Sequence, residues 1–465
     1  MAEPLWTSAE IAAATGGRLA GAPFAATGVS IDTRTLEPGD LFVALAGVRD
    51  GHEFVGQAFA KGAAGVLAVR PVEGSAVLVD EALPALERLG LAARERAPQT
   101  RRGAVTGSVG KTSVTQAIRA GLMRGGRAHS SVKSYNNHIG VPLTLARMPR
   151  DTARAVFEIG MNHADEIAPL SRMVRPHAVA ITTVGPVHVE NFPDGEAGVA
   201  RAKAEIFAGL EPRGIAVLNA DNTWFGDLRA AAIAAGGEVR AFGADAAADA
   251  QLTGFSVEGA RAIVSARLHG RTISFPILQT GVHWGPNSLA VILMLEALGL
   301  PLDDGLAALA DFEPLEGRGA EASVRTRAGA FTLVDESYNA NPISMAAAIA
   351  SLGARVVSGR RIVALTDMLE LGDGGPKFHS DLVEPIQSAR VDLVFCAGPL
   401  MKSLWDALPP TRRGGYAESA ADLAPQVAQA VEPGDVVMVK GSNGSRAGAI
   451  AAALRALDAA SEGDT

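Results

Sequence analysis

The loop formed by residues 106–112, with the sequence TGSVGKT, constrains the fold of this chain more than any other segment. It follows a short apolar run at 103–106 and precedes a helical stretch at 113–123. Glycines let backbone N–H groups turn towards phosphates, the lysine places a positive charge near the β and γ phosphates, and the threonine hydroxyl can hold Mg²⁺. The segment therefore predicts a nucleotide-binding P-loop. The predicted phosphate-binding residues are Thr106, Gly107, Ser108, Val109, Gly110, Lys111 and Thr112.

The match to the general P-loop pattern is incomplete, because Val105 stands where the first glycine belongs. A chance glycine turn before a helix is the alternative interpretation. We favour the P-loop because Gly110, Lys111 and Thr112 are all present. The position of the loop between a predicted strand and a predicted helix supports the same choice.

Apolar β-like runs and helical stretches alternate along most of the chain, which predicts parallel sheets with helices on their faces. Domains usually hold about 100–200 residues, so a chain of 465 residues is expected to form several. We predict an α/β protein of three domains. These are a small N-terminal α/β domain at 1–100, a central P-loop parallel-sheet domain at 101–315, and a C-terminal Rossmann-like doubly wound domain at 316–465. Residues 98–102 are interpreted as a polar linker.

Composition narrows the choice of partners. The formal net charge is −8 and no long run of lysine and arginine offsets it, so neither nucleic acid nor an anionic membrane is expected. The single cysteine, Cys396, excludes an intramolecular disulfide. The longest apolar run, at 289–295, is far shorter than the ~18 residues that suggest a membrane span, and residues 1–4 do not resemble a signal peptide. We expect a cytoplasmic monomer without membrane insertion.

Three residues beyond the P-loop are candidates for chemistry. Glu158 ends an apolar run, and a carboxylate at the carboxyl end of a strand beside a P-loop is placed to bind Mg²⁺. On spacing alone, His188 is interpreted as a hydrogen-bonded structural residue and Lys203 as a solvated lysine on a helix. The polar stretches 133–142 and 335–342 are either capped turns or loops that grip a ligand.

Together these segments resemble the Mur ligase family. The likeness covers almost the whole chain, and the phosphate loop of that family reads TGxxGKT without the first glycine, which accounts for Val105. The other matching segments are 136–144, 158–163, 184–190, 202–207, 335–342, 367–372 and 440–442. The runs YNANP at 338–342 and MLELG at 368–372 are typical of the family member that adds D-alanyl-D-alanine.

The resemblance implies roles for residues of the central domain. Thr112 and Glu158 would hold the Mg²⁺ that bridges the ATP phosphates. Glu158, His188 and Lys203 would hold a second Mg²⁺, with Lys203 carbamylated, and this replaces the interpretation as a solvated lysine. The expected catalytic residues are Lys111, Glu158, His188 and Lys203.

The resemblance also implies nucleotide and substrate contacts in all three domains. His283 and Asn287 match a His-Asn-x-x-Asn element near adenine, in which Trp284 replaces the first asparagine. The expected ATP contacts of the C-terminal domain are Arg318, Asp335 and Asn339. The expected substrate contacts are Ser30, Asp32, Thr33, Arg34, Asp50, Gly51 and His52, which look like uridine-nucleotide recognition elements, together with Asn136, Asn137 and Lys440.

The activity implied by the resemblance is an ATP-dependent ligation. The terminal carboxylate of UDP-N-acetylmuramoyl-tripeptide would attack the γ-phosphate of ATP, and the amine of D-alanyl-D-alanine would then displace phosphate from the acyl phosphate. Three alternatives remain open at this point. They are a sibling ligase that adds a single amino acid, a P-loop kinase or regulatory NTPase, and a non-catalytic nucleotide-binding protein.

Overall fold

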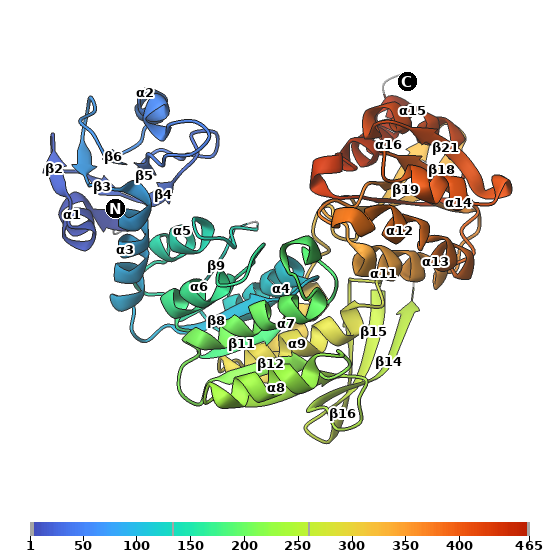
Figure 1. Cartoon of the computed structure of the whole chain (residues 1–465), viewed down its shortest axis with the longest axis horizontal. Coiled ribbons are helices and arrows are strands. Elements are labelled where there is room, and N and C mark those ends of the chain that lie inside the picture. Colours follow the sequence, from blue (N-terminus) through green and yellow to red (C-terminus); the bar gives the residue numbers. More distant parts are fainter. Residues whose placement is uncertain (1–3, 133, 259–260, 463–465) are drawn as a thin grey trace.

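Three α/β lobes follow one another along the chain in the computed structural model, which describes residues 4–132, 134–258 and 261–462 (Figure 1). Within these residues the strands form sheets of five, nine and six strands, with an additional two-stranded ribbon. The sheets are mainly parallel and lie one in each lobe. The predicted α/β class and three-lobed architecture are therefore confirmed.

The N-terminal lobe is built on the sheet β2-β7-β6-β5-β4, in which only the β2–β7 pair is antiparallel. Helix α1 (Ser8–Thr15) begins with a capping box between Thr7 and Glu10 and ends at Gly16 in the left-handed conformation. The strands are β1 (Trp6–Thr7), β2 (Arg18–Ala20), β3 (Ala25–Ala26), β4 (Gly28–Ser30), β5 (Asp40–Val43), β6 (Gly65–Ala68) and β7 (Ala76–Leu78). Helices η1 (Gly51–Phe54) and α2 (Val55–Ala60) lie between β5 and β6.

A shared apolar core fixes the N-terminal lobe on the central lobe. Helix α3 (Ala82–Glu95) buries one face against α5 (Gly140–Ala146), and Leu143 and Ala146 of α5 belong to the same buried cluster as the N-terminal strands. At Gly90 the two helices approach so closely that a Cβ would lie 2.9 Å from the carbonyl oxygen of Pro142. The indole of Trp6 also donates a hydrogen bond of 2.8 Å to the carbonyl of Ala146. These contacts join the two lobes as one packed body.

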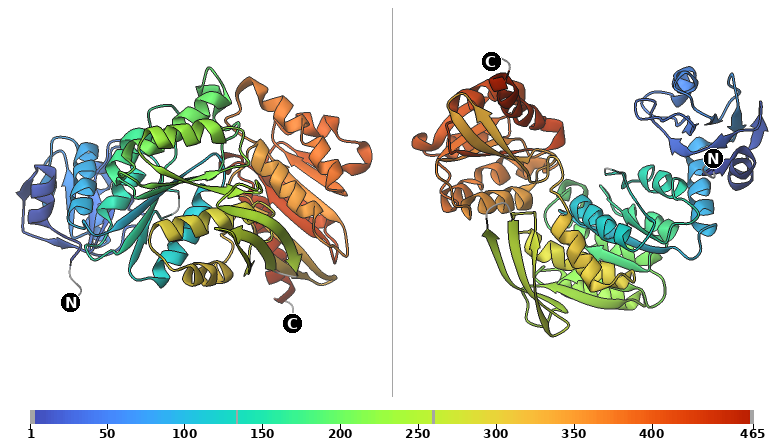
Figure 2. Two further views of the ribbon diagram at one scale, coloured as in Figure 1. Left: turned by 90° about the horizontal axis from the view of Figure 1, so that it is seen from below. Right: turned by 180° about the vertical axis from the view of Figure 1, so that it is seen from behind.

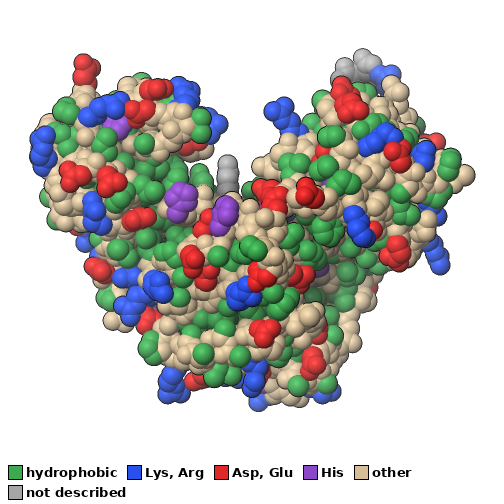
Figure 3. Space-filling model, in the orientation of Figure 1, with side chains coloured by type: hydrophobic (Ala, Val, Ile, Leu, Met, Phe, Trp, Pro, Cys, Tyr) green, Lys and Arg blue, Asp and Glu red, His purple; other side chains and the backbone are tan. Residues whose placement is uncertain are grey.

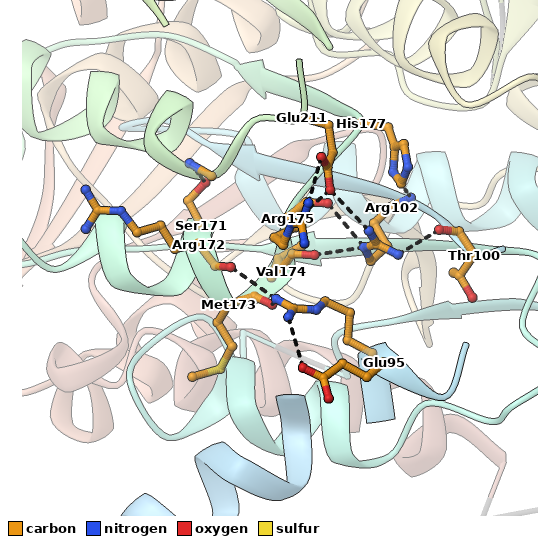
Figure 4. Close-up of polar contacts among 12 residues, drawn as sticks. Glu95, Thr100, Arg102, Ser171, Arg172, Met173, Val174, Arg175, His177 and Glu211 are labelled. Carbon is orange, nitrogen blue, oxygen red and sulfur yellow. Dashed lines mark hydrogen bonds and ion pairs between the residues drawn. The ribbon is translucent and has the colours of Figure 1, made fainter. Parts of the chain in front are cut away.

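The interpretation of residues 98–102 as a polar linker is wrong at its end, because β8 (Arg101–Thr106) begins there and buries Arg102 (Figure 4). The Arg102 Nε donates to the carbonyl of Val174 at 2.8 Å and to that of Arg175 at 3.2 Å. These carbonyls end helix α6 (Ile167–Val174), where the helix dipole favours a cation. Glu211 lies 3.7 Å from the same guanidinium. Burial and the neighbouring cation Arg94 lower the pKa of Arg102 to about 10.

Replacing Arg102 with alanine is expected to lower the free energy of unfolding by about 3 kcal/mol, since it leaves the carbonyls of Thr100 and Val174 without the guanidinium that donates to them and opens a space in the interior. Urea denaturation followed by circular dichroism measures this change. The matched control is Arg101→Ala, one residue earlier in the same strand, which removes an exposed side chain with one hydrogen bond to Ala297. Equal losses in both variants would contradict the structural role of Arg102.

The central sheet has the order β16-β15-β14-β13-β12-β11-β8-β10-β9, and all neighbouring pairs between β9 and β14 in this order are parallel. The strands are β8, β9 (Ala128–Ser130), β10 (Arg154–Glu158), β11 (Ala178–Ile181), β12 (Ile215–Asn219), β13 (Glu238–Gly243), β14 (Ala250–Glu258), β15 (Arg261–Leu268) and β16 (Arg271–Ile277). β15 and β16 extend the sheet in antiparallel fashion, which the expectation of a parallel sheet did not include.

Helices cover both faces of the central sheet. One buried cluster contains α4 (Lys111–Arg124), α9 (Trp284–Ala297) and α10 (Leu302–Asp311). The opposite cluster contains residues of α5, α6, α7 (Glu196–Ala204) and α8 (Phe225–Ala234). Because β8 lies between β10 and β11, the carboxyl end of β8 is a topological switch point, where ligands bind in open α/β sheets.

The C-terminal lobe is a doubly wound domain with the strand order β17-β18-β22-β19-β20-β21, parallel except for β17. Its strands are β17 (Ala320–Thr326), β18 (Gly329–Glu336), β19 (Arg361–Thr366), β20 (Leu393–Ala397), β21 (Arg413–Ala417) and β22 (Val436–Lys440). One face is covered by α11 (Pro342–Gly353), α12 (Gly375–Ser380), α13 (Val383–Ser388) and α14 (Lys402–Ala407), and the other by α15 (Ala420–Ala430) and α16 (Gly448–Glu462).

The N-terminal and C-terminal lobes stand on opposite ends of the central lobe, as the views in Figure 2 show. The space-filling view shows a deep notch between them, with the central lobe as its floor (Figure 3). No helix in the described part of the chain is long and apolar enough to cross a membrane.

Candidate active site

The P-loop connects β8 to α4 and contains two glycines at positive φ. Gly107 has φ 148° and Gly110 has φ 86°, values that side chains rarely tolerate. A Cβ on Gly107 would also collide with the hydroxyl of Thr182, which follows β11. Val105, in contrast, is a buried strand residue of β8 that pairs with Ala180 of β11. The loop therefore requires glycine at 107 and 110 and packs an apolar side chain at 105.

The P-loop is anchored on the segment that follows β11. The Ser108 N–H donates to the carbonyl of Thr183 at 2.8 Å, and its hydroxyl donates to the carbonyl of Gly185 at 3.1 Å. The hydroxyl of Thr182 donates to the carbonyl of Val109. These bonds hold the loop open at the carboxyl edge of the sheet.

Lys111 is the first residue of α4, and its half-buried side chain turns back to the loop. The Lys111 Nζ donates to the carbonyl of Gly107 at 2.7 Å. Burial lowers the pKa of Lys111, the nearby carboxylate of Glu158 acts in the opposite sense, and the cation Arg318 lowers it further. The next residue, Thr112, places its hydroxyl 3.1 Å from the hydroxyl of Ser134.

Glu158 ends β10 beside the P-loop and is 1% exposed. Its Oε1 accepts a hydrogen bond of 2.7 Å from the side-chain amide of Asn136, and its backbone N–H donates to Ser131. The other oxygen, Oε2, is buried without a hydrogen-bond partner among the described residues. An oxygen left in this way is a suitable ligand for a hard cation such as Mg²⁺, because Mg²⁺ is held in proteins by carboxylate and hydroxyl oxygens.

Lys203 lies in α7 and is 3% exposed, so the interpretation as a solvated lysine is wrong. Its ammonium makes no hydrogen bond or ion pair with the described residues. Burial and the charge of Lys111 place the pKa of Lys203 well below its ordinary value. Burial therefore favours the neutral form of the Lys203 amine, which is the nucleophilic form.

His188 lies in the segment after β11 with φ 59°, an uncommon conformation for a residue other than glycine. Its Nδ1 lies 2.9 Å from Oε2 of Glu370, which belongs to the C-terminal lobe. Burial and the neighbouring cations Lys111 and Lys203 lower the pKa of His188 to about 4. The imidazole is therefore neutral near pH 7, which is the form that binds metal ions.

The C-terminal lobe contributes a second set of polar groups. The ammonium of Lys440, at the end of β22, lies 3.2 Å from Oε2 of Glu336 and donates to the carbonyl of Asn339 at 3.0 Å. The guanidinium of Arg318 lies over the ring of Tyr338, 4.0 Å from its centroid. Glu336 and Tyr338 complete the polar surface beside the predicted contacts Arg318, Asn339 and Lys440.

The two sets of residues face one cavity of about 420 Å³ between the central and C-terminal lobes. The predicted residues that line it are Ser108, Val109, Gly110, Lys111, Thr112, Asn136, Glu158, His188, His283, Asn287, Arg318, Asn339 and Lys440. Residues that line it and were not predicted as contacts include Ser134, Thr182, Asn219, Glu336 and Tyr338. The cavity thus lies between the P-loop and the strand ends of the C-terminal lobe.

Some predicted residues lie elsewhere than the prediction implies. Asp335 is 2% exposed, and its carboxylate pairs with Arg455 and accepts from the Ser337 N–H, so it is Glu336 that lines the cavity. The side chain of Asn137 accepts from two N–H groups at the start of α5 and acts as a capping residue. Thr106, Gly107 and Lys203 are buried around the cavity but are not among its lining residues.

The position next to His283 is occupied by a core residue. Trp284 is 3% exposed and its ring packs against Phe312, with centroids 5.9 Å apart. This leaves little indole surface for stacking on a ligand. His283 is half-buried, and its buried Nδ1 has no hydrogen-bond partner among the described residues. Asn287 lies beside Gly110 of the P-loop.

The predicted uridine-nucleotide contacts form a separate group in the N-terminal lobe. Arg34 is exposed and pairs with the carboxylate of Asp32 at 2.7 Å, while Ser30 and Thr33 are buried. Asp50 accepts from the backbone and ring of His52 and from Arg70, and these bonds lower its pKa. Gly51 packs against the backbone of Leu45 so closely that a Cβ would lie 2.6 Å from its carbonyl oxygen.

This fold and this site define a P-loop enzyme with three α/β domains. Comparison with known proteins agrees with this class of enzyme and identifies the family. The profile described as the Mur ligase middle domain matches residues 105–295, and that described as the Mur ligase glutamate ligase domain matches residues 322–443. The chain belongs to the Mur ligase family.

Similar proteins cover nearly the whole chain. The UDP-N-acetylmuramoyl-tripeptide–D-alanyl-D-alanine ligase of Bacillus subtilis is 34% identical over 429 residues, covering 90% of this chain and 91% of its own. The Escherichia coli ligase of the same name is 34% identical over 451 residues, covering 95% of this chain and 96% of its own. The crystal structure of MurF from Acinetobacter baumannii superposes with a TM-score of 0.84 at 27% identity, covering 98% of this chain and 99% of its own.

Proposed function

We propose that this enzyme joins D-alanyl-D-alanine to UDP-N-acetylmuramoyl-tripeptide at the expense of ATP, in the synthesis of peptidoglycan precursors. The observation that carries the proposal is the cavity in which the P-loop, Glu158 and His188 of the central lobe face Lys440 and Asn339 of the C-terminal lobe. The names of the relatives that match the chain over its length support the choice of substrates. In this proposal residues 1–100 bind the UDP group, residues 101–315 bind ATP, and residues 316–465 bring the amine.

Two magnesium positions fit the side chains present. Thr112 and Glu158 would hold the ion that accompanies the ATP phosphates, and the unpartnered Oε2 of Glu158 supports this assignment. Glu158, His188 and carbamylated Lys203 would hold the second. When bound, the ions neutralise negative charge that develops on the transferred phosphoryl group.

The burial of the Lys203 amine, which favours its neutral form, supports the proposed carbamylation. The amine nitrogen would attack CO₂, form an N–C bond and release one proton, which leaves an anionic carbamate. In the described part of the chain, no group of three or more histidine, cysteine, aspartate or glutamate side chains could hold a metal ion. A carbamate at Lys203 would supply a third, anionic ligand to the ion held by Glu158 and His188.

The side chains of the cavity suit an acyl-phosphate reaction. The peptide carboxylate forms a bond to the γ-phosphorus as the bond to the ADP oxygen breaks. Lys111 and the P-loop N–H groups hold the phosphates in place, and positioning and charge neutralisation are what phosphoryl transfer requires of a protein. The amine of D-alanyl-D-alanine then attacks the acyl carbon, loses a proton and displaces phosphate.

The proposal is tested by phosphate release from the full-length protein with ATP and Mg²⁺. Release is expected with UDP-N-acetylmuramoyl-tripeptide and D-alanyl-D-alanine together, and not when either is omitted. The matched controls replace the dipeptide by single amino acids, or the tripeptide by shorter UDP-muramoyl acceptors. Release that depends on a single amino acid would assign the chain to a sibling ligase instead.

The proposed enzyme acts as a monomer in the cytoplasm, where ATP and UDP-linked precursors are made.

A further inference from the structure

Ser134 connects the P-loop to the C-terminal lobe through three hydrogen bonds. Its Oγ lies 3.1 Å from Oγ1 of Thr112, the hydroxyl assigned to magnesium. The phenol of Tyr338 donates to the same Oγ at 3.1 Å, and Arg318 donates to it at 3.4 Å. Tyr338 lies 204 residues further along the chain, so the contact exists only when the two lobes are docked.

The number of donors and acceptors fixes the direction of these bonds. A serine hydroxyl has one hydrogen and two acceptor lone pairs. Tyr338 and Arg318 both donate, and together they occupy both lone pairs. The single hydrogen of Ser134 must therefore point to Thr112, which accepts it. Thr112 then keeps its second lone pair for a cation and cannot direct its own hydrogen at Ser134.

The two donors are held together in the C-terminal lobe. The guanidinium of Arg318 stacks on the ring of Tyr338, and the backbone N–H of Tyr338 donates to the carbonyl of Gly317 at 3.0 Å. Among the described residues, no buried apolar cluster contains residues of both the central and the C-terminal lobe, so polar groups carry much of the contact between them. Domains joined in this way can change their relative position.

We propose that Ser134 is a positioning residue that couples docking of the C-terminal lobe to the magnesium-binding hydroxyl of the P-loop. When the lobe docks, Tyr338 and Arg318 direct the Ser134 hydrogen to Thr112 and orient a Thr112 lone pair for the ion. When the lobe is undocked, Ser134 is free to accept from Thr112, and that orientation is lost. By linkage, magnesium nucleotide favours the docked arrangement to the same extent. This inference rests on the proposed assignment of Mg²⁺ to Thr112.

The test measures ADP binding to the full-length protein by calorimetry, with and without Mg²⁺. The gain in affinity that Mg²⁺ provides is then compared between the wild-type protein and its variants. Ser134→Ala and Tyr338→Phe are each expected to reduce this gain about three- to tenfold, the effect of one hydrogen bond, and to change the affinity for ADP alone by less than that. The double variant is expected to lose no more than Ser134→Ala, because both changes act through one hydroxyl.

The matched control is Tyr135→Phe, which removes a phenolic hydroxyl one residue from Ser134 and is expected to keep the wild-type gain. Additive losses in the double variant would overturn the coupling, as would an equal loss of ADP affinity with and without Mg²⁺ in Tyr338→Phe. An unchanged gain in Ser134→Ala would do the same. ADP binding requires neither peptide nor dipeptide, so the coupling can fail while the ligase assay succeeds. A wild-type protein without any Mg²⁺-dependent gain would overturn both the coupling and the assignment of Thr112.

Discussion

Lys203→Ala is expected to lower the rate of phosphate release about a hundredfold or more, because it removes the group that becomes an anionic ligand at the reacting phosphoryl group. Formate or acetate, added at increasing concentration, is expected to restore part of the rate. Truncation to alanine leaves space beside Glu158 and His188, and a small carboxylate there can replace the oxygens of the carbamate. The measurement is steady-state phosphate release against acid concentration.

Two variants serve as controls for Lys203. Arg201→Ala changes a neighbouring cation on the same helix that is exposed and paired with Asp194, and it is expected to keep near wild-type activity. Lys203→Arg fills the space with a group that stays charged and cannot accept CO₂, so it is expected to be inactive and not restored by acids. Full activity of Lys203→Ala would remove Lys203 from the site. Equal restoration of Lys203→Arg would show a general salt effect.

Glu158→Gln is expected to lower the rate about a hundred- to a thousandfold, since it removes the one carboxylate shared by both proposed magnesium positions. The shape of the side chain and the bond from Asn136 can be kept, so the fold should be retained. Wild-type protein should gain thermal stability when ADP and Mg²⁺ are added together, and the variant should lose most of this gain. Differential scanning calorimetry with and without the ligands measures it.

The matched control is Glu166→Gln, which neutralises an exposed acid in the segment that follows β10. The Glu166 carboxylate pairs with His163 and does not line the cavity. Near wild-type activity is expected for this variant. If Glu158→Gln and Glu166→Gln behaved alike, the loss would reflect the net charge of the lobe rather than a metal ligand.

The parts of the site that depend on one short, continuous segment of the chain could be predicted from the sequence. Residues 106–112 form a P-loop because glycine conformations, a lysine and a helix start are encoded within seven positions. Glu158 was predicted because a strand end beside a P-loop has a known place in a parallel sheet. The burial of Lys203 could also have been predicted. Residues 199, 200, 206 and 207, three and four positions away on either side, are all apolar, and helical spacing places them around it.

Other features depend on contacts between distant segments. Arg102 follows a proline and another arginine, which is the composition of a linker, and only the end of α6 explains its burial. The hydrogen bonds of Ser134 to Tyr338 and Arg318 join different domains, so no local spacing predicts them. The antiparallel β15 is a different case, because its buried residues alternate at 262, 264, 266 and 268. That period of two is a local signal for a half-exposed strand.

The apolar packing of α3 on α5 has a consequence for exchanging parts between relatives. An N-terminal lobe transplanted from another ligase would bring its own α3 but would meet the α5 of this chain, with Gly90 set against Pro142. A fold-compatible chimera must therefore carry residues 140–146 along with the lobe, although they lie beyond the P-loop in the chain. The N-terminal and central lobes are thus expected to be exchanged as one packed unit, because their shared core includes residues of both.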